Sequence, residues 1–226
     1  HDALDARWYD DGQPMGGLAD GCCAVVIEPP RWTPCTAGWL RDCRDEAARA
    51  GALLVVDEMV YGGRWALGGA TEYFGVTPDL ACYGKALGNG QAIAFVVGKE
   101  ALADHGELVS GTYSGDIVGL LALRNVLRVY RDEPVIETLW KRGRQLRRGL
   151  REAIERSAYP VHLEGAPVHQ RLRFEDAALG RIFAARMASH GVLWHPDVVN
   201  ISYAMTEAHI ERVVEAAAAS LQEMSA

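Results

Sequence analysis

Residues 51–58 have the sequence GALLVVDE, in which a continuous apolar run ends at two adjacent acids. An apolar run without alternation is typical of a strand that is buried on both faces of a sheet. A similar run at 22–27 and a helical pattern at 37–50 precede it, and further apolar runs occupy 80–83 and 92–97. This alternation of strands and helices predicts an α/β fold, with a parallel sheet that helices cover on both sides.

The second part of the chain predicts a smaller α/β unit. Before it, helices are expected at 116–131 and from Pro134 to about residue 157. The small unit, residues 160–226, has expected strands at 161–164 and 168–174, a helix at 176–189, a short strand after Gly191, and a last helix at 206–222. We place the domain boundary in the long helix, which gives domains 1–140 and 141–226.

The composition excludes several classes of protein. The 226 residues include 23 basic and 30 acidic side chains, a net charge of −7, which argues against a general nucleic-acid binder. The five cysteines are odd in number and lack CxxC spacing, so we expect a reducing, cytoplasmic setting. Within these 226 residues we find no pattern of a signal peptide and no apolar run long enough to cross a bilayer, so we expect no membrane segment among them. Because the first residue is His1 rather than Met, we expect the protein to continue upstream.

Two predicted strands end in groups that carry chemistry. Asp57 ends one strand and Lys85 follows another, and the carboxyl ends of parallel strands are where such sheets bind ligands. A lysine amine forms a Schiff base with the aldehyde of pyridoxal 5'-phosphate (PLP), and a carboxylate can hold the proton on its ring nitrogen. Glu58 leaves the strand on the side opposite Asp57, so we expect it to matter less. A loop-capping aspartate and an exposed lysine remain the plain alternative.

A nucleotide-binding site is a second alternative, because residues 53–58 resemble a Walker B strand. Such an enzyme also needs the sequence GxxxxGK[ST]. Here Gly84-Lys85 is followed by Ala86, and Asp79 stands where the first glycine should be. The pair also follows the acidic strand instead of preceding it. We therefore reject this alternative for the residues of this chain.

Several segments, taken together and in order, resemble one family. They are VVIEP (25–29), GALLVVDE (51–58), GATEYFGVTPDL (69–80), GKALGNG (84–90) and GTYSGD (111–116), with weaker matches at 172–176, 191–193 and 200–204. These segments are similar to the class III PLP-dependent aminotransferases, especially the glutamate-1-semialdehyde aminomutase branch. The resemblance implies an aspartate aminotransferase-like large domain of fold type I, here partial, followed by a small C-terminal α/β domain.

The resemblance also implies roles for four residues. Asp57 would bind the pyridine nitrogen of PLP, Lys85 would bind the cofactor covalently, and Met59 would lie against the ring. Thr112 would bind the phosphate of the partner subunit's cofactor in a homodimer. A helix expected to start near Ser114 supports this role, because helix N-termini attract phosphate; a simple capping residue is the alternative. The implied reaction transfers or moves an amino group between a small-molecule amine and a carbonyl compound.

Departures from the family pattern leave the substrate open. Met59 stands where the family usually has Val, Tyr61 and Gly63 differ in volume from the residues usual there, and Met205 replaces a usual His. The histidines lack metal-ligand spacing, so no metal site is predicted. For Arg173 we favour a structural ion pair over contact with a substrate carboxylate.

Two other functions remain open: another PLP reaction, such as racemisation or decarboxylation, and a non-catalytic or split-chain structural partner of a PLP enzyme. We expect residues 1–226 alone to be an incomplete enzyme. The family places further phosphate-binding, ring-stacking and substrate-binding residues upstream of the part that this chain resembles.

Overall fold

The computed structural model describes residues 17–18, 20–103, 111–112 and 114–224. The chain divides into two compact units, His1–Leu127 and Arg128–Ala226, each of which is described by itself below. The division falls inside helix α4 (Ile117–Asp132). The next helix, α5 (Val135–Glu155), contains the boundary predicted at 140/141 and lies wholly in the second unit.

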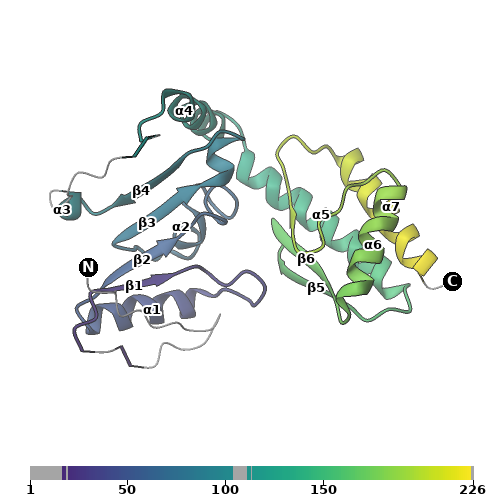
Figure 1. Cartoon of the computed structure of the whole chain (residues 1–226), viewed down its shortest axis with the longest axis horizontal. Coiled ribbons are helices and arrows are strands. Elements are labelled where there is room, and N and C mark those ends of the chain that lie inside the picture. The colour runs from purple at the N-terminus through teal and green to yellow at the C-terminus, as the bar shows by residue number, and fades with distance from the viewer. Residues whose placement is uncertain (1–16, 19, 104–110, 113, 225–226) are drawn as a thin grey trace. The chain divides into compact units, whose positions relative to one another are not determined.

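The first unit is built on a four-stranded sheet with the order β1-β2-β3-β4 (Figure 1). Its strands are β1 (Ala24–Ile27), β2 (Leu53–Asp57), β3 (Leu80–Gly84) and β4 (Ala94–Gly98). The first three are parallel, as predicted, but β4 is antiparallel to β3, so the prediction of a wholly parallel sheet is wrong. The physical reason is the short connection between β3 and β4, because a parallel crossover needs a dozen or more residues.

Helix α1 (Ala37–Arg49) covers one face of this sheet. It begins where the hydroxyl of Thr36 accepts a hydrogen bond from the Trp39 N–H at 3.1 Å, an ordinary N-cap. Its buried residues pack with those of β1 and β2 in one core cluster: Val25, Cys43, Ala47, Ala52, Leu54 and Val56. Alternate side chains of β2 therefore point to the face covered by α1, where Leu54 and Val56 are both fully buried.

The opposite face of the sheet, here called the open face, carries Val26, Val55, Leu80, Cys82 and Val96, which pair across the strands. Val26 is 70 % exposed and Val96 is 60 % exposed. The expected helical cover on both faces is thus absent from the open face among residues 17–18, 20–103, 111–112 and 114–127. Asp57 belongs to this face, because it pairs with Cys82.

Three further helical segments complete the first unit: α2 (Gly69–Phe74), the 3-10 turn η1 (Lys85–Gly88) and α3 (Glu100–Ala103). The start of α4 lies against the turn before β4, where a Cβ added at Gly119 would be 3.1 Å from the Ala92 carbonyl oxygen. The apolar side chains of α4 are largely exposed, Ile117 by 70 %. The first unit therefore presents apolar surface both on the open face and on α4.

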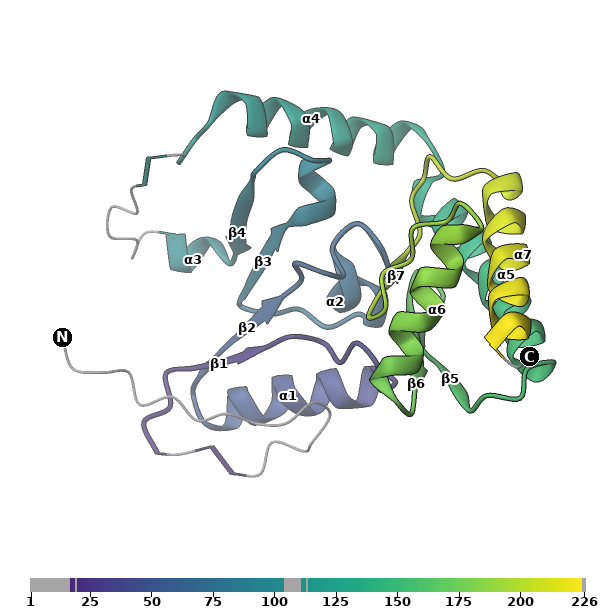
Figure 2. The same cartoon turned by 45° about the vertical axis from the view of Figure 1, so that its right-hand side comes forward.

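The second unit has an antiparallel sheet with the order β5-β6-β7 and three helices (Figure 2). Its strands are β5 (Val161–Ala166), β6 (His169–Phe174) and β7 (Val199–Asn200), and its other helices are α6 (Ala177–Ser189) and α7 (Glu207–Met224). The short strand predicted after Gly191 is wrong: that stretch is irregular, with Leu193 96 % exposed, and the third strand lies farther on.

Among the helices in the described part of the chain, none combines the length and the apolar character that crossing a bilayer requires.

Candidate functional site

Strand β2 places Asp57 at the carboxyl edge of the first sheet. The side chain is half-buried on the open face, and its Oδ1 accepts a hydrogen bond from the Met59 N–H at 2.9 Å. Within the described residues, Oδ2 accepts no hydrogen bond from the protein. One oxygen is therefore anchored to the backbone, and the other is available to a ligand that carries an N–H group.

Lys85 follows β3 directly, at the same edge of the sheet, and begins the turn η1. Its backbone is left-handed, with φ +45°, and Asn89 at the end of the turn has φ +47°. A left-handed conformation at a residue other than glycine costs on the order of 1–3 kcal/mol, and such strain concentrates at functional sites. Lys85 is exposed, so its amine is available to a ligand.

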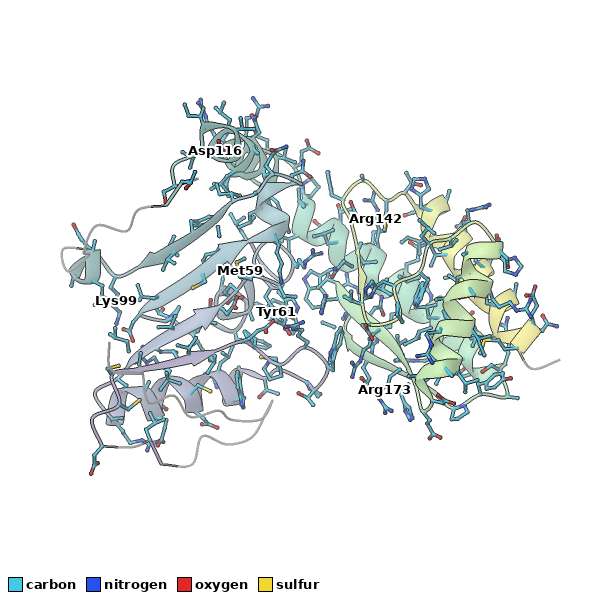
Figure 3. The ribbon with its side chains drawn as sticks, viewed as in Figure 1. Met59, Tyr61, Lys99, Asp116, Arg142 and Arg173 are labelled. Carbon is cyan, nitrogen blue, oxygen red and sulfur yellow. The ribbon has the colours of Figure 1, made fainter. Side chains whose placement is uncertain are left out.

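Met59, which is labelled in Figure 3, lies between Asp57 and Lys85. A Cβ added at Gly84 would lie 2.7 Å from the Met59 Cε and 2.8 Å from the Ile93 carbonyl oxygen. The Met59 side chain thus reaches from the end of β2 to the residue just before Lys85, through space that only glycine leaves free. The structure brings Asp57 and Lys85 to one edge of the sheet, as the sequence predicts, and it places Met59 beside them.

Glu58 lies beside this site but on the covered face, and it is fully buried. Its Oε2 accepts from the Ala70 N–H at 2.9 Å and its Oε1 from the Thr71 N–H at 2.7 Å, both in the first turn of α2. Burial raises the pKa of the Glu58 carboxyl above its usual value, and the hydrogen bonds from Thr71 and Ala70 oppose that rise. The expectation that Glu58 points away from Asp57 is confirmed, but the sequence did not predict its partners.

A third acid, Asp79, lies at the other end of β3 and has a structural role. Its carboxylate accepts from Arg44 at 2.6 Å, from Lys99 (labelled in Figure 3) at 2.6 Å and from the Leu54 N–H at 2.7 Å. Burial alone would raise the pKa of Asp79, but these partners hold it at about 2. Asp79 therefore ties α1, β2, β3 and the end of β4 together as an ionised group.

Thr112 is exposed and precedes α4 without capping it. The helix begins at Ile117, and the Asp116 Oδ2 accepts from the Gly119 N–H at 2.8 Å, so Asp116 is its capping side chain. The helix therefore begins within one residue of the predicted range 116–131 but three residues after Ser114, and a carboxylate rather than Thr112 stands at its N-terminus. Tyr113, next in the motif, lies outside the described residues.

Tyr61, one of the departures noted in the sequence, belongs to the core. Its side chain is 1 % exposed and its hydroxyl donates to the Pro30 carbonyl oxygen at 2.7 Å (labelled in Figure 3). Its ring meets that of Trp65 edge-on, with centroids 5.4 Å apart. The extra volume of Tyr61 is thus accommodated by packing between the loop after β2 and the end of β1.

Arg173 in the second unit has a protein partner. Its Nε lies 2.6 Å from the Glu164 Oε1, and Arg171 lies 2.7 Å from the other oxygen of the same carboxylate. The predicted structural ion pair is therefore confirmed. Among the described residues, no group of three or more His, Cys, Asp or Glu side chains is arranged to hold a metal ion.

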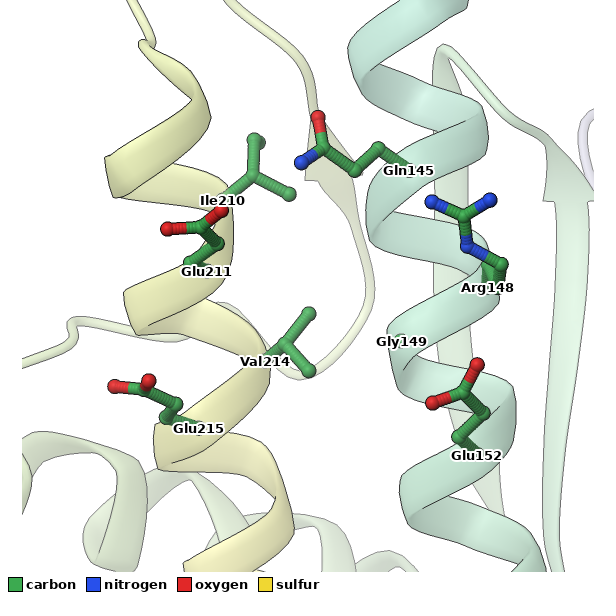
Figure 4. A pocket seen from close by; sticks show the side chains of 8 residues that line it. All are labelled: Gln145, Arg148, Gly149, Glu152, Ile210, Glu211, Val214 and Glu215. Atoms are coloured by element: carbon green, nitrogen blue, oxygen red, sulfur yellow. The ribbon is translucent and has the colours of Figure 1, made fainter.

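A shallow groove of about 270 Å³ runs between α5 and α7 in the second unit (Figure 4). It is lined by Gln145, Arg148, Gly149, Glu152, Ile210, Glu211, Val214 and Glu215. At its floor the helices interlock closely, because a Cβ at Gly149 would lie 2.4 Å from the Val214 Cγ2. Its mixed charges are those of an exposed surface between two helices, and the strand edge of the first unit remains the candidate site.

Comparison with known proteins bears on this site. A family model described as "Aminotransferase class-III" matches residues 17–220. The glutamate-1-semialdehyde 2,1-aminomutase of Thermomicrobium roseum is 32 % identical over 227 residues, which cover 89 % of this chain and 53 % of that protein. The 3-aminobutyryl-CoA aminotransferase of Cloacimonas acidaminovorans is 32 % identical over 198 residues, covering 83 % of this chain and 48 % of that protein.

Solved structures agree in fold. The PLP internal aldimine form of the FumI protein from Sphingopyxis sp. MTA144 matches with a TM-score of 0.83 and 28 % identity, over 89 % of this chain and 51 % of that one. An omega-transaminase from Sphaerobacter thermophilus matches with a TM-score of 0.78 and 23 % identity, over 88 % and 51 %. The chain spans about half the length of these relatives.

Proposed function

The chain belongs to the class-III aminotransferase family, and from this premise we propose that the whole protein transfers or moves an amino group between a small-molecule amine or amino acid and a carbonyl compound, with PLP as cofactor. The observation that carries the proposal is the meeting of Asp57 and Lys85 at the carboxyl ends of two neighbouring parallel strands. A carboxylate and a lysine at such an edge suit a cofactor with a ring nitrogen and an aldehyde.

The residues at this edge fit PLP in three respects. Asp57 has one anchored oxygen and one oxygen available to a protonated ring nitrogen. Lys85 offers an exposed amine, and Met59 offers an apolar surface beside it. We propose that these three residues hold the cofactor.

When bound, PLP withdraws electrons from the substrate carbon that carries the amino group. The protein residues do the rest. The Asp57 carboxylate keeps the proton on the ring nitrogen, since a neighbouring negative charge favours the protonated ring. The Lys85 Nζ would hold the cofactor, and the free amine would move the proton at the substrate Cα as a general base. Met59 limits the ring's movement by contact alone.

The other two lysines of this chain are already engaged. Lys99 forms an ion pair with Asp79 at 2.6 Å, and Lys141 forms one with Glu207 at 2.8 Å. Lys85 forms no ion pair with the residues that the structure describes. This difference supports Lys85 as the cofactor lysine.

The test is chemical trapping in the whole protein. PLP is added, the protein is reduced with borohydride, and the pyridoxyl group is mapped by peptide mass spectrometry. We expect the label on Lys85 and its disappearance in the Lys85→Ala variant, whereas Lys141→Ala should keep it. A label on Lys99 or Lys141 in the wild-type protein contradicts the assignment.

We further propose a homodimer in which Thr112 contacts the phosphate of the partner subunit's cofactor. The family resemblance and the exposure of Thr112 support this role. We also propose the cytoplasm as the compartment, since the five cysteines are free thiols: Cys22, Cys23, Cys35, Cys43 and Cys82.

A further inference from the structure

The Glu58 carboxylate is a buried ionisable group that the proposed chemistry does not use. It is fully buried, and both oxygens accept backbone hydrogen bonds, at 2.9 Å from Ala70 and at 2.7 Å from Thr71. A buried carboxylate is stable only when its oxygens are satisfied in this way. Glu58 therefore pins the start of α2 to the end of β2.

Gly69 is shaped around this carboxylate. A Cβ at that position would lie 2.1 Å from the Glu58 Oε2 and 2.5 Å from the Cδ, and the backbone has φ +81°. Both the contact and the left-handed backbone require glycine. The carboxylate occupies the space that a Cβ at position 69 would fill, so Glu58 and the start of α2 are closely packed.

The backbone of Glu58 is held as firmly as its side chain. Its N–H donates to the Cys82 carbonyl oxygen at 3.0 Å, and its own carbonyl accepts from the Gly62 N–H at 2.7 Å. The residue thus connects β3, the turn after β2, and α2. We call residues 58–69 the Glu58 loop. The backbone hydrogen bonds of Glu58 fix the start of this loop, and its side chain fixes the end through Ala70 and Thr71.

Met59 follows Glu58 in the Glu58 loop. Its N–H donates to the Asp57 Oδ1 at 2.9 Å, and its Cε occupies the space left open at Gly84, next to Lys85. A shift of the loop would therefore move the donor that anchors Asp57 and the methyl group beside Lys85 at the same time. Both effects would reach the proposed cofactor site, although Glu58 itself faces the other way.

We infer that Glu58 is a positioning residue, which holds the Glu58 loop so that Met59 stays on Gly84 and anchors Asp57. The inference rests on the proposed function for the identity of the site, and on the geometry above for the mechanism. Removing the charge leaves an N–H group of α2 buried without an adequate acceptor, and the loop relaxes to satisfy it. The cofactor is then held less tightly, although Glu58 does not touch it.

The experiment compares Glu58→Gln with Glu72→Gln in the whole protein. Glu72 is a matched control, because its carboxylate also accepts a backbone hydrogen bond at α2, from the Gly68 N–H at 2.5 Å, but it is exposed. The first readout needs no cofactor: amide hydrogen exchange of peptides that cover 58–71. We expect the exchange rate of these amides to rise by about tenfold in Glu58→Gln, which corresponds to the loss of one buried hydrogen bond. In Glu72→Gln we expect the exchange rate to stay unchanged.

The second readout is the dissociation constant of PLP, measured on the folded protein with Lys85 labelling as the check of occupancy. We expect it to rise by about tenfold in Glu58→Gln and to stay constant in Glu72→Gln. If Glu58 acts through Met59, Glu58→Gln should add little to a Met59→Ala protein, because coupled residues are not additive. A purely structural role would lower the melting temperature without this coupling.

The outcomes separate the inference from the proposed function. If wild-type Lys85 is not labelled, the proposed function fails, whatever the exchange data show. If Lys85 is labelled but Glu58→Gln retains PLP like Glu72→Gln, the inference is overturned. It is also overturned if the losses from Glu58→Gln and Met59→Ala add fully. Should Glu58→Gln fail to fold, Glu58→Asp, which keeps the charge but shortens the reach, is expected to give a smaller loss with the same coupling to Met59.

Discussion

At the residue scale, Asp57 is the side chain whose charge the proposed chemistry needs most. Asp57→Asn keeps an oxygen for the Met59 N–H but loses the negative charge that keeps the ring nitrogen protonated. We predict a loss of about 10³ in the rate of amino transfer by the whole protein, with the fold intact by circular dichroism. Asp42→Asn, the same change at an exposed position on α1, should leave the rate unchanged. A folded Asp57→Asn protein with near-normal turnover contradicts the role.

The sequence predicts the parts of the site that lie at strand ends. Asp57 and Lys85 could be placed together because the carboxyl ends of neighbouring parallel strands meet at one edge. The partners of Glu58 could not be predicted, since they belong to a six-residue helix with no clear sequence pattern. The left-handed backbone of Lys85 could not be predicted from the sequence either, because the turn between β3 and β4 imposes it. The glycine pair Gly68-Gly69, which follows the acids by about ten residues, is the sequence feature that could have pointed to Glu58.

At the scale of elements, the ionised Asp79 is a polar contact that joins the strands to α1, beside the apolar core. We predict that Asp79→Asn lowers the free energy of unfolding at pH 7 by about 2 kcal/mol, because hydrogen bonds to a charged group are lost. The pKa of this carboxyl is depressed to about 2 in the folded protein, so its contribution is full at neutral pH. It shrinks once the pH falls below about 4, where the unfolded chain takes up the proton, and is lost as the pH passes the folded pKa.

The measurement is the urea midpoint of wild type and variant at pH 7, 4 and 3. The difference between the two proteins should narrow toward pH 3. Asp132→Asn is the control, since Asp132 is exposed and its ion pair among the described residues is with the neighbouring Arg131. A difference that is constant across this pH range would show that the charge of Asp79 is not what stabilises the fold.

Most elements follow from the sequence, and the exceptions have local causes. Apolar runs and helical spacing located β1, β2, β3, α1, α5 and α7 to within a few residues. The direction of β4 was wrong, because an apolar run alone does not distinguish parallel from antiparallel pairing, whereas the length of the connection does. The third strand of the second unit was misplaced, because a two-residue strand is too short to show a pattern.

At the scale of the whole molecule, the proposed role of Thr112 predicts complementation between subunits. Lys85→Ala and Thr112→Ala proteins, each impaired alone, are unfolded together and refolded as a mixture. A mixed dimer then has one site with both defects and one with neither, so activity should return toward the fraction of intact sites. Mixing Lys85→Ala with Asp57→Asn chains is the control. Each of these changes impairs the site of the subunit that carries it, so a mixed dimer has no intact site and no activity should return. Mixed dimers without activity in the first mixture would show that Thr112 does not act across the dimer.

The open face predicts how residues 1–226 behave when they are produced by themselves. Apolar side chains such as Val26 and Val96 are exposed there, on the same face as Asp57. Exposed apolar patches of this kind promote association with other chains. We predict weak retention of PLP and negligible amino transfer from these residues alone, with recovery when the whole protein is used. The check is size-exclusion chromatography with PLP absorbance and a transfer assay; a soluble dimer of residues 1–226 with robust turnover contradicts the prediction.

The antiparallel pairing of β4 with β3 also has a consequence for folding, because it joins neighbouring segments of the chain. A hairpin joins segments that are close in sequence, and hairpins form within about 1–10 μs. The pairing of β2 with β3 joins more distant segments and is expected to come later, because closing a longer loop costs more entropy. The turn of the β3–β4 hairpin is the one that holds Lys85 in its left-handed conformation. We therefore expect the backbone around Lys85 to take its native form before Asp57 reaches it, with the pairing of β2 and β3 as the later step.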